Sequence, residues 1–143
     1  MNDEHYRKLE NMYASAPINR YFAPQLSVTD GKATLSMAVR PDFFHAAGAI
    51  HGSVYFKALD DSAFFAANSL VSDVFVLTVS FTTYIVRPVS QGTLLATGSV
   101  VHRSRSLIVA ESTIVDAEGR QVARGSGTFM PSRIALHEDI GYR

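Results

Sequence analysis

The stretch SVYFKALDDSAFFAANSLV, residues 53–71, decides which fold we expect for this chain of 143 residues. A single helix is predicted over these residues. Its few polar positions fall on one stripe of the helical wheel: Ser53, Lys57, Asp61 and Asn68. A helix that is apolar on almost every other side is buried on most of its surface. The rest of the chain is therefore expected to surround it.

The sequence on either side of this helix has the pattern of β-strands. Residues 25–29 and 32–40 flank Asp30-Gly31, a dipeptide typical of a tight hairpin. Four later segments are rich in Val, Thr, Ile and Phe and are separated by short turns: 74–86, 93–103, 107–116 and 121–130. The simplest way for five or six antiparallel strands to bury one helix is to wrap around it. We therefore expect an α+β fold with an antiparallel β-sheet around a long central helix.

The chain is expected to form one domain, residues 1–143, because it contains no repeat, low-complexity tract or linker. Residues 3–14 are predicted to form a peripheral helix with a thin apolar stripe, and residues 17–24 connect it to the hairpin. Residues 1–24 are thus interpreted as an N-terminal helix and connector that belong to the same domain.

Composition excludes several kinds of chemistry. Thirteen basic and thirteen acidic residues give a formal net charge of zero, so no global field attracts nucleic acid or an anionic membrane. The absence of cysteine excludes disulfides, thiolate metal sites and cysteine nucleophiles. The five histidines form no metal-binding pattern, and no metal site is predicted. Neither a signal peptide nor a membrane-spanning stretch is recognised, so a cytoplasmic location is expected.

Asp60 is the candidate catalytic acid because it lies at the edge of the polar stripe. Its neighbours on the helix are apolar: Phe56, Ala63, Phe64 and Ala67. Partial desolvation raises the pKa of a carboxyl group and suits it to act as a base. Asp61 follows Lys57 by four residues, and these two are predicted to form a solvated ion pair. A plain structural role for Asp60 is the alternative.

The start of the helix offers a second component of a catalytic site. A glycine at this place lets a ligand approach the backbone, and free N–H groups there favour an anion or oxyanion. The amides of Gly52 and Ser53 could therefore polarise an acyl carbonyl, with Asp60 a little over two turns further on. Donors and a base are the two components that acyl transfer needs. A capped helix whose glycine only eases packing is the alternative.

The stretch HGSVYFKALDDSA, residues 51–63, resembles the HGG-x-x-x-x-L-x-D/E-x-A signature of hotdog-fold acyl-CoA thioesterases. The most similar kinds are the phenylacetate-degradation and 4-hydroxybenzoyl-CoA types. The resemblance extends over residues 25–132, where Arg87-Pro88 followed by Gly92 is similar to the family's R-P-x-x-x-G turn. It implies the hotdog fold, in which the sheet wraps around the central helix. Ser53 replaces the second glycine of the signature.

The resemblance implies a role for several positions. Asp60 is the catalytic carboxylate, as a general base or a nucleophile, although the adjacent Asp61 leaves a one-residue ambiguity. Gly52 supplies the oxyanion-hole amide. His45 stands where the family usually has an Asn or Gln that holds the carbonyl or water. Thr78 matches a Ser or Thr that comes from the second subunit of a dimer and orients the water.

Other candidate residues have less specific signals. His51 is a site candidate next to Gly52, and a structural hydrogen bond before the helix is favoured over direct catalysis. Arg87, Arg103 and Arg105 are candidates to bind the CoA phosphates, for which the guanidinium group is well suited. A solvated surface position is equally consistent with each of these arginines.

The expected function is hydrolysis of an acyl-CoA thioester to a free carboxylic acid and CoA, with CoA as part of the substrate and no cofactor. A non-catalytic acyl-CoA-binding protein is one alternative. A hydratase that pairs His45 or His51 with Asp60 is the other. The exposed sheet edge and the resemblance imply a homodimer or homotetramer with active sites between subunits. No nucleic-acid or membrane partner is expected. The acyl group, and the choice between CoA and acyl-carrier protein, are left open.

Overall fold

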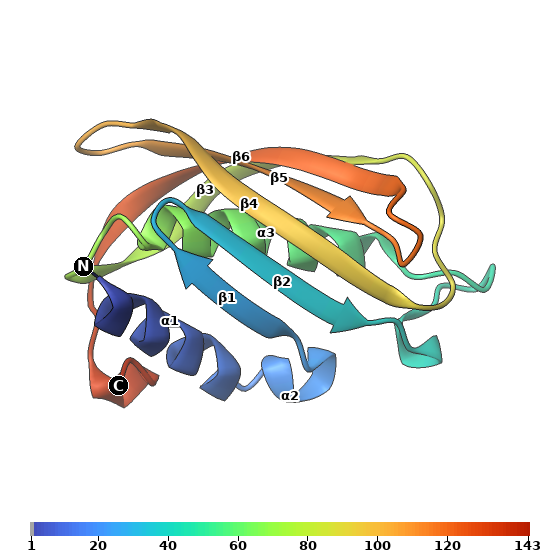
Figure 1. Ribbon diagram of the computed structural model, residues 1–143, viewed down its shortest axis with the longest axis horizontal. Helices are drawn as coiled ribbons and strands as arrows, with labels where there is room; N and C mark the ends of the chain where they lie inside the picture. The colour runs from blue at the N-terminus through green and yellow to red at the C-terminus, as the bar shows by residue number, and fades with distance from the viewer. Residues whose placement is uncertain (1) are drawn as a thin grey trace.

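The computed structural model describes residues 2–143 and shows a six-stranded antiparallel sheet around one long helix (Figure 1). The elements in chain order are α1 (Asp3–Ser15), α2 (Asn19–Phe22), β1 (Gln25–Thr29), β2 (Lys32–Ala38), the 3-10 helix η1 (Pro41–Phe43), α3 (Gly52–Asn68), β3 (Val74–Ile85), β4 (Thr93–Arg103), β5 (Ile108–Val115), β6 (Gln121–Ala135) and the 3-10 helix η2 (Glu138–Ile140). The strand order is β1-β2-β4-β5-β6-β3. The expected α+β architecture is confirmed, with β1 and β3 at the two edges of the sheet.

Helix α3 forms the centre of the core because small side chains let the strands approach it closely. Ala58, Ala63, Ala66 and Ala67 have no solvent exposure, and β4 approaches so closely that a Cβ atom on Gly98 would overlap the backbone of Ser62. Glycine at that position of β4 therefore permits the helix–sheet packing.

The close approach at Gly98 predicts the effect of adding a single methyl group. Gly98→Ala should lower the free energy of unfolding by about 1–3 kcal/mol, because neither backbone can move away without disturbing the core. Urea denaturation followed by circular dichroism measures this change. The control is Ser99→Ala on the same strand, which should alter stability little. Equal stability of the two variants would contradict the packing described here.

Helix α3 ends at Asn68, three residues before the predicted end, and this residue is buried rather than part of a solvated stripe. Its side-chain oxygen accepts a hydrogen bond from the Val76 amide at 3.0 Å, and its amide nitrogen donates to the carbonyls of Val71 and Val74 at 3.1 Å. The side chain thus joins the turn after the helix to the start of β3, which explains why a polar residue is stable there.

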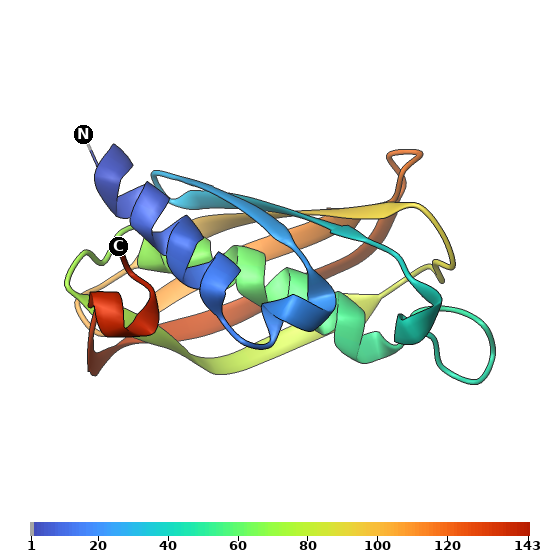
Figure 2. The ribbon, with the colours of Figure 1, turned by 90° about the horizontal axis from the view of Figure 1, so that it is seen from below.

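Helix α1 is less peripheral than predicted, because it crosses α3 on the side that the sheet leaves open (Figure 2). Five of its side chains are buried: His5, Tyr6, Leu9, Met12 and Tyr13. At the edge of the sheet, Arg7 donates to the Val28 carbonyl of β1 at 2.8 Å, and the Val28 amide donates to Glu10 at 2.8 Å. These contacts cover the β1 edge, whereas the outer side of β3 has no partner strand within residues 2–143.

No helix within residues 2–143 is long and apolar enough to cross a membrane.

Candidate active site

Asp60 lies on α3 and faces β3, where the Thr78 hydroxyl donates a hydrogen bond to its Oδ1 at 2.9 Å. Burial raises the pKa of Asp60 to about 6; the Thr78 hydrogen bond acts against this shift, the Asp61 charge adds to it, and Lys57 lowers it. Within residues 2–143, Asp60 Oδ2 has no hydrogen-bond donor. The carboxyl group is therefore held by one oxygen while the other can meet a ligand.

A bulge in β3 brings Thr78 to this position. Thr78 pairs with Phe129 and Ser80 with Thr128, so that Val79 has no counterpart on β6. An inserted residue changes which side of a strand the following residues face. As a result both Thr78 and Phe81, three residues apart, contact α3. Phe81 meets the ring of Phe56 at a centroid distance of 5.6 Å.

Asp61, the other acid of the pair, is held through its Oδ2 atom by two protein groups. Lys57 Nζ lies 2.7 Å from Asp61 Oδ2, and the Tyr13 hydroxyl donates to the same oxygen at 2.6 Å. The Lys57 and Asp61 side chains are only 14% and 17% exposed, so the prediction of a solvated pair is wrong. Helix α1 covers the pair, and Tyr13 remains protonated because burial, followed by the Asp61 charge, raises its pKa.

Both carboxylates line a pocket of 780 Å³ between α1, α3, β3 and the C-terminal segment. Its apolar surface includes Met12, Phe64, Phe65, Phe75, Leu77 and Ile140. A polar reacting group set in a largely apolar cavity is the usual form of a small-molecule site. We take this pocket as the candidate active site and call it the Asp60 pocket.

The start of α3 has a different environment. His51 caps the helix, since its Nδ1 accepts the Ser53 amide at 3.0 Å. Gly52 lines a separate pocket of 390 Å³, together with His45 and Arg87. The His45 side chain is exposed, and its Nδ1 accepts the Ala47 amide at 3.0 Å. We call this second cavity the Gly52 pocket.

The structure therefore brings the predicted site residues together in two groups rather than one. Asp60 and Thr78 of the same chain share one pocket, whereas the resemblance implies a Thr78 from the second subunit; Gly52 and His45 share the other pocket. Asp60 follows Gly52 by eight positions in the α-helix, so the two residues lie about 12 Å apart along the helix axis. The expectation that the donors at the N-terminus of the helix face Asp60 is thus not met within one chain. A single thioester carbonyl cannot contact both the Gly52 amide and the Asp60 carboxylate of that chain.

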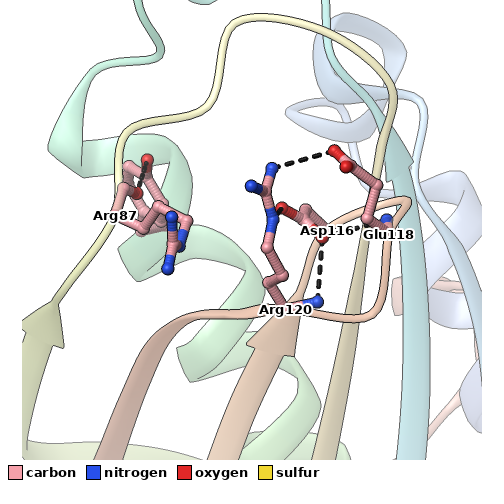
Figure 3. Close-up of polar contacts among 5 residues, drawn as sticks. Arg87, Asp116, Glu118 and Arg120 are labelled. Carbon is pink, nitrogen blue, oxygen red and sulfur yellow. Dashed lines mark hydrogen bonds and ion pairs between the residues drawn. The ribbon is translucent and has the colours of Figure 1, made fainter.

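The three candidate arginines are also separated. Figure 3 shows Arg87 apart from the turn in which Arg120 pairs with Asp116 at 2.9 Å and with Glu118 at 2.8 Å. Within residues 2–143 no carboxylate lies within ion-pair distance of Arg87. Arg103 donates to the Leu70 carbonyl at 2.7 Å, and with Arg105 it lines a third pocket near the C-terminal end of α3. Only Arg87 lies beside Gly52.

Sequence reasoning missed the contribution of α1 and the C-terminal segment to the Asp60 pocket. The sequence pattern places Tyr13 only within the apolar stripe of the predicted helix at residues 3–14, yet its hydroxyl group binds Asp61, which lies 48 residues away in the chain. No spacing rule connects two such positions. A tyrosine within an apolar stripe was the one available signal, since a buried hydroxyl group needs a hydrogen-bond partner.

Comparison with known proteins decides the family. A model described as the thioesterase superfamily matches residues 47–123, more than half of the chain. The chain belongs to the thioesterase superfamily. The matched region contains Gly52, Asp60 and Thr78, and the resemblance to the hotdog thioesterases is confirmed. Membership supports a thioester hydrolase in general terms, without identifying the substrate.

Individual relatives agree with this assignment. A candidate esterase of Mycobacterium tuberculosis is 34% identical over 97 residues, which are 65% of this chain and 69% of that protein. A solved structure of an esterase candidate from the same species has 28% identity and a TM-score of 0.77, covering 82% of this chain and 97% of that one. The Escherichia coli PaaI protein, from the phenylacetic acid degradation operon, has a TM-score of 0.85 at 21% identity, with 94% and 97% coverage, and shows the shared fold.

Proposed function

We propose that this protein hydrolyses an acyl-CoA thioester to a free carboxylic acid and CoA, with Asp60 as the catalytic carboxylate, either a general base or a nucleophile. The observation that carries the proposal is the position of Asp60: a carboxyl group with a pKa of about 6 in an apolar pocket of a thioesterase-superfamily chain. Such a pKa leaves the group ionised at neutral pH and still basic enough to take a proton.

Two routes are compatible with this geometry. As a general base, Asp60 Oδ2 takes a proton from water while the water oxygen attacks the carbonyl carbon. The C–S bond then breaks, and the CoA sulfur leaves as a thiolate that is protonated. As a nucleophile, the same oxygen attacks the carbon directly, the C–S bond breaks and the CoA thiolate leaves and is protonated. Water then hydrolyses the resulting anhydride to the free acid and the Asp60 carboxylate. In either route the Thr78 hydroxyl fixes the orientation of the carboxylate through Oδ1.

The oxyanion donor is proposed to come from a second copy of the chain. The Gly52 amide is too far from Asp60 to stabilise the same carbonyl within one protomer, as the helix geometry requires. Strand β3, which carries Thr78, is an open edge with exposed apolar side chains such as Leu77 and Val79. Pairing of two such edges would form a homodimer, and a homotetramer is compatible with the same pairing.

The CoA moiety is proposed to extend over the Gly52 pocket. Arg87 is exposed there without a carboxylate partner and can meet a phosphate, and His45 can donate a hydrogen bond to the carbonyl or to water. Arg103 and Arg105 remain proposals for the distal phosphates only, because they line a different pocket. No cofactor is proposed beyond the CoA of the substrate.

The two alternatives receive less support. The hydratase needs a histidine beside the acid, but within one chain His45 lines the other pocket and His51 caps α3, so only a second copy of the chain could supply that pair. The binding protein would be favoured if Asp60 were half of a surface ion pair, but it is Asp61 that pairs with Lys57, and α1 covers that pair. A thiol-release assay over short, medium, long and aromatic acyl-CoAs tests the proposal. Binding of acyl-CoA without release of thiol would contradict it.

The pH dependence of hydrolysis reports on Asp60. Because the carboxylate is the reactive form, kcat/KM should fall as pH decreases through about 6. The Thr78 hydrogen bond stabilises the carboxylate, so Thr78→Val should raise the pKa and move this limb to higher pH. Steady-state rates between pH 5 and 9 measure the shift, with Ser80→Ala as the control. An unchanged limb in Thr78→Val would exclude this role of the hydroxyl.

A further inference from the structure

The Asp60 pocket has a wall where helix α1 meets the C-terminal segment, residues 138–143. Met12 and Ser15 of α1 and Ile140 and Gly141 of the C-terminal segment all line the pocket. We propose that these four residues, here called the terminal wall, limit the length of the acyl group that the enzyme accepts. This inference rests on the proposed function, since it assigns the acyl arm of the thioester to this pocket.

Charge and polarity favour the acyl arm over the CoA arm. Four carboxylates line the pocket, namely Asp60, Asp61, Glu138 and Asp139, against two basic groups, Lys57 and Arg143. An excess of negative charge opposes the phosphates of CoA. The aromatic and aliphatic side chains of the same pocket suit a hydrocarbon group, which gains free energy in proportion to the area it buries. The Gly52 pocket has the opposite charge, because Arg87 lines it and, among the described residues, no carboxylate does.

Helix α1 is held firmly against this pocket. Met12 and Tyr13 are each 5% exposed, and the Tyr13 ring meets Phe65 edge-on at a centroid distance of 5.0 Å. The hydroxyl of Tyr13 is fixed on Asp61 at 2.6 Å. Contacts at both ends of the side chain keep this part of α1 from moving aside when a longer acyl group enters.

The C-terminal segment is fastened to the same helix by three contacts. The Tyr142 hydroxyl lies 2.7 Å from His5 Nδ1, while His5 Nε2 donates to the Asn68 carbonyl at 2.9 Å. Asn11 donates to the Arg143 carbonyl at 2.6 Å. Gly141 has a φ of +92° and packs so closely that an added Cβ would overlap the Ser15 hydroxyl. The two termini of the chain therefore close this side of the pocket together.

The wall is tested by changing its volume in both directions. Met12→Ala removes side-chain volume, so the preferred acyl group should become longer. Ile140→Trp adds volume at a position that is 38% exposed and tolerant of change, so the preferred group should become shorter. Each methylene that still enters the pocket should improve the dissociation constant about fourfold. Val101→Ala and Val101→Trp, on an exposed part of β4, are the matched controls and should not alter the preference.

The measurement is binding of a series of straight-chain S-alkyl-CoA thioethers by calorimetry, in parallel with hydrolysis of the corresponding thioesters. The thioethers cannot be hydrolysed, so their length preference reports on the wall even if the wild type releases no thiol. Absence of hydrolysis by the wild type would contradict the proposed function alone. An unchanged length preference in both folded wall variants, or a shift equal to that of the Val101 controls, would overturn the inference.

Discussion

Replacement of Asp60 by asparagine is expected to lower kcat for thioester hydrolysis by about a hundredfold to ten-thousandfold, the usual contribution of a catalytic acid or base. The amide oxygen can still accept the Thr78 hydrogen bond, whereas the basic oxygen is lost. Asp61→Asn is the matched comparison. It removes the charge that pairs with Lys57, so it should lower the free energy of unfolding. It should reduce kcat much less than Asp60→Asn does. Thiol-release kinetics measure both variants, and a larger loss in Asp61→Asn would reverse the assignment.

Stability distinguishes loss of chemistry from loss of fold in this experiment. The pKa of Asp60 is raised from 3.8 to about 6, so ionisation of this group costs stability, and the cost grows as pH rises from about 4 to 6 and then stays constant. Asp60→Asn removes that cost. Its melting temperature near neutral pH should therefore equal or exceed that of the wild type, and a marked decrease would indicate that the inactive variant is also poorly folded.

Most of the fold could be predicted because its determinants are local. The apolar helix over residues 53–71 has to be surrounded, and a sheet wrapped around it is the simplest way for the predicted strands to do so. Asp30-Gly31 forms the predicted hairpin, with Gly31 at a φ of +68°. Even the separation of Gly52 and Asp60, about 12 Å along the helix axis, follows from the helical rise of 1.5 Å per residue and could be calculated from the sequence.

The shape of the site could not be predicted in the same way, because it depends on contacts between distant parts of the chain. Tyr13 reaches Asp61, and His5 meets Tyr142, 137 residues away. The sequence periodicity places His5 and Tyr13 in a peripheral helix and predicts no hydrogen-bond partner for either side chain. The bulge at Val79 is likewise invisible in the alternation of β3, although it determines that Thr78 faces Asp60.

A charge placed on the open edge of strand β3 is expected to have the second large effect on activity. It contains no charged residue and no proline to protect its open side, and Val79 is 57% exposed. Val79→Asp should convert the proposed dimer into a monomer of 15.6 kDa and lower kcat/KM by about a hundredfold to a thousandfold, the usual effect of losing an oxyanion donor. Light scattering and thiol release measure the two changes.

Val101→Asp is a close control for that variant, because Val101 also lies at a register shift, on β4, and is 54% exposed. It introduces the same charge far from the β3 edge and should leave both the dimer and its activity unchanged. The Gly52 amide and the Asp60 carboxylate of one chain are about 12 Å apart along α3, so Gly52 of a lone protomer cannot serve as the oxyanion donor for its own Asp60. A Val79→Asp monomer with full activity would show that each chain carries a complete site, and the Gly52 assignment would have to be abandoned.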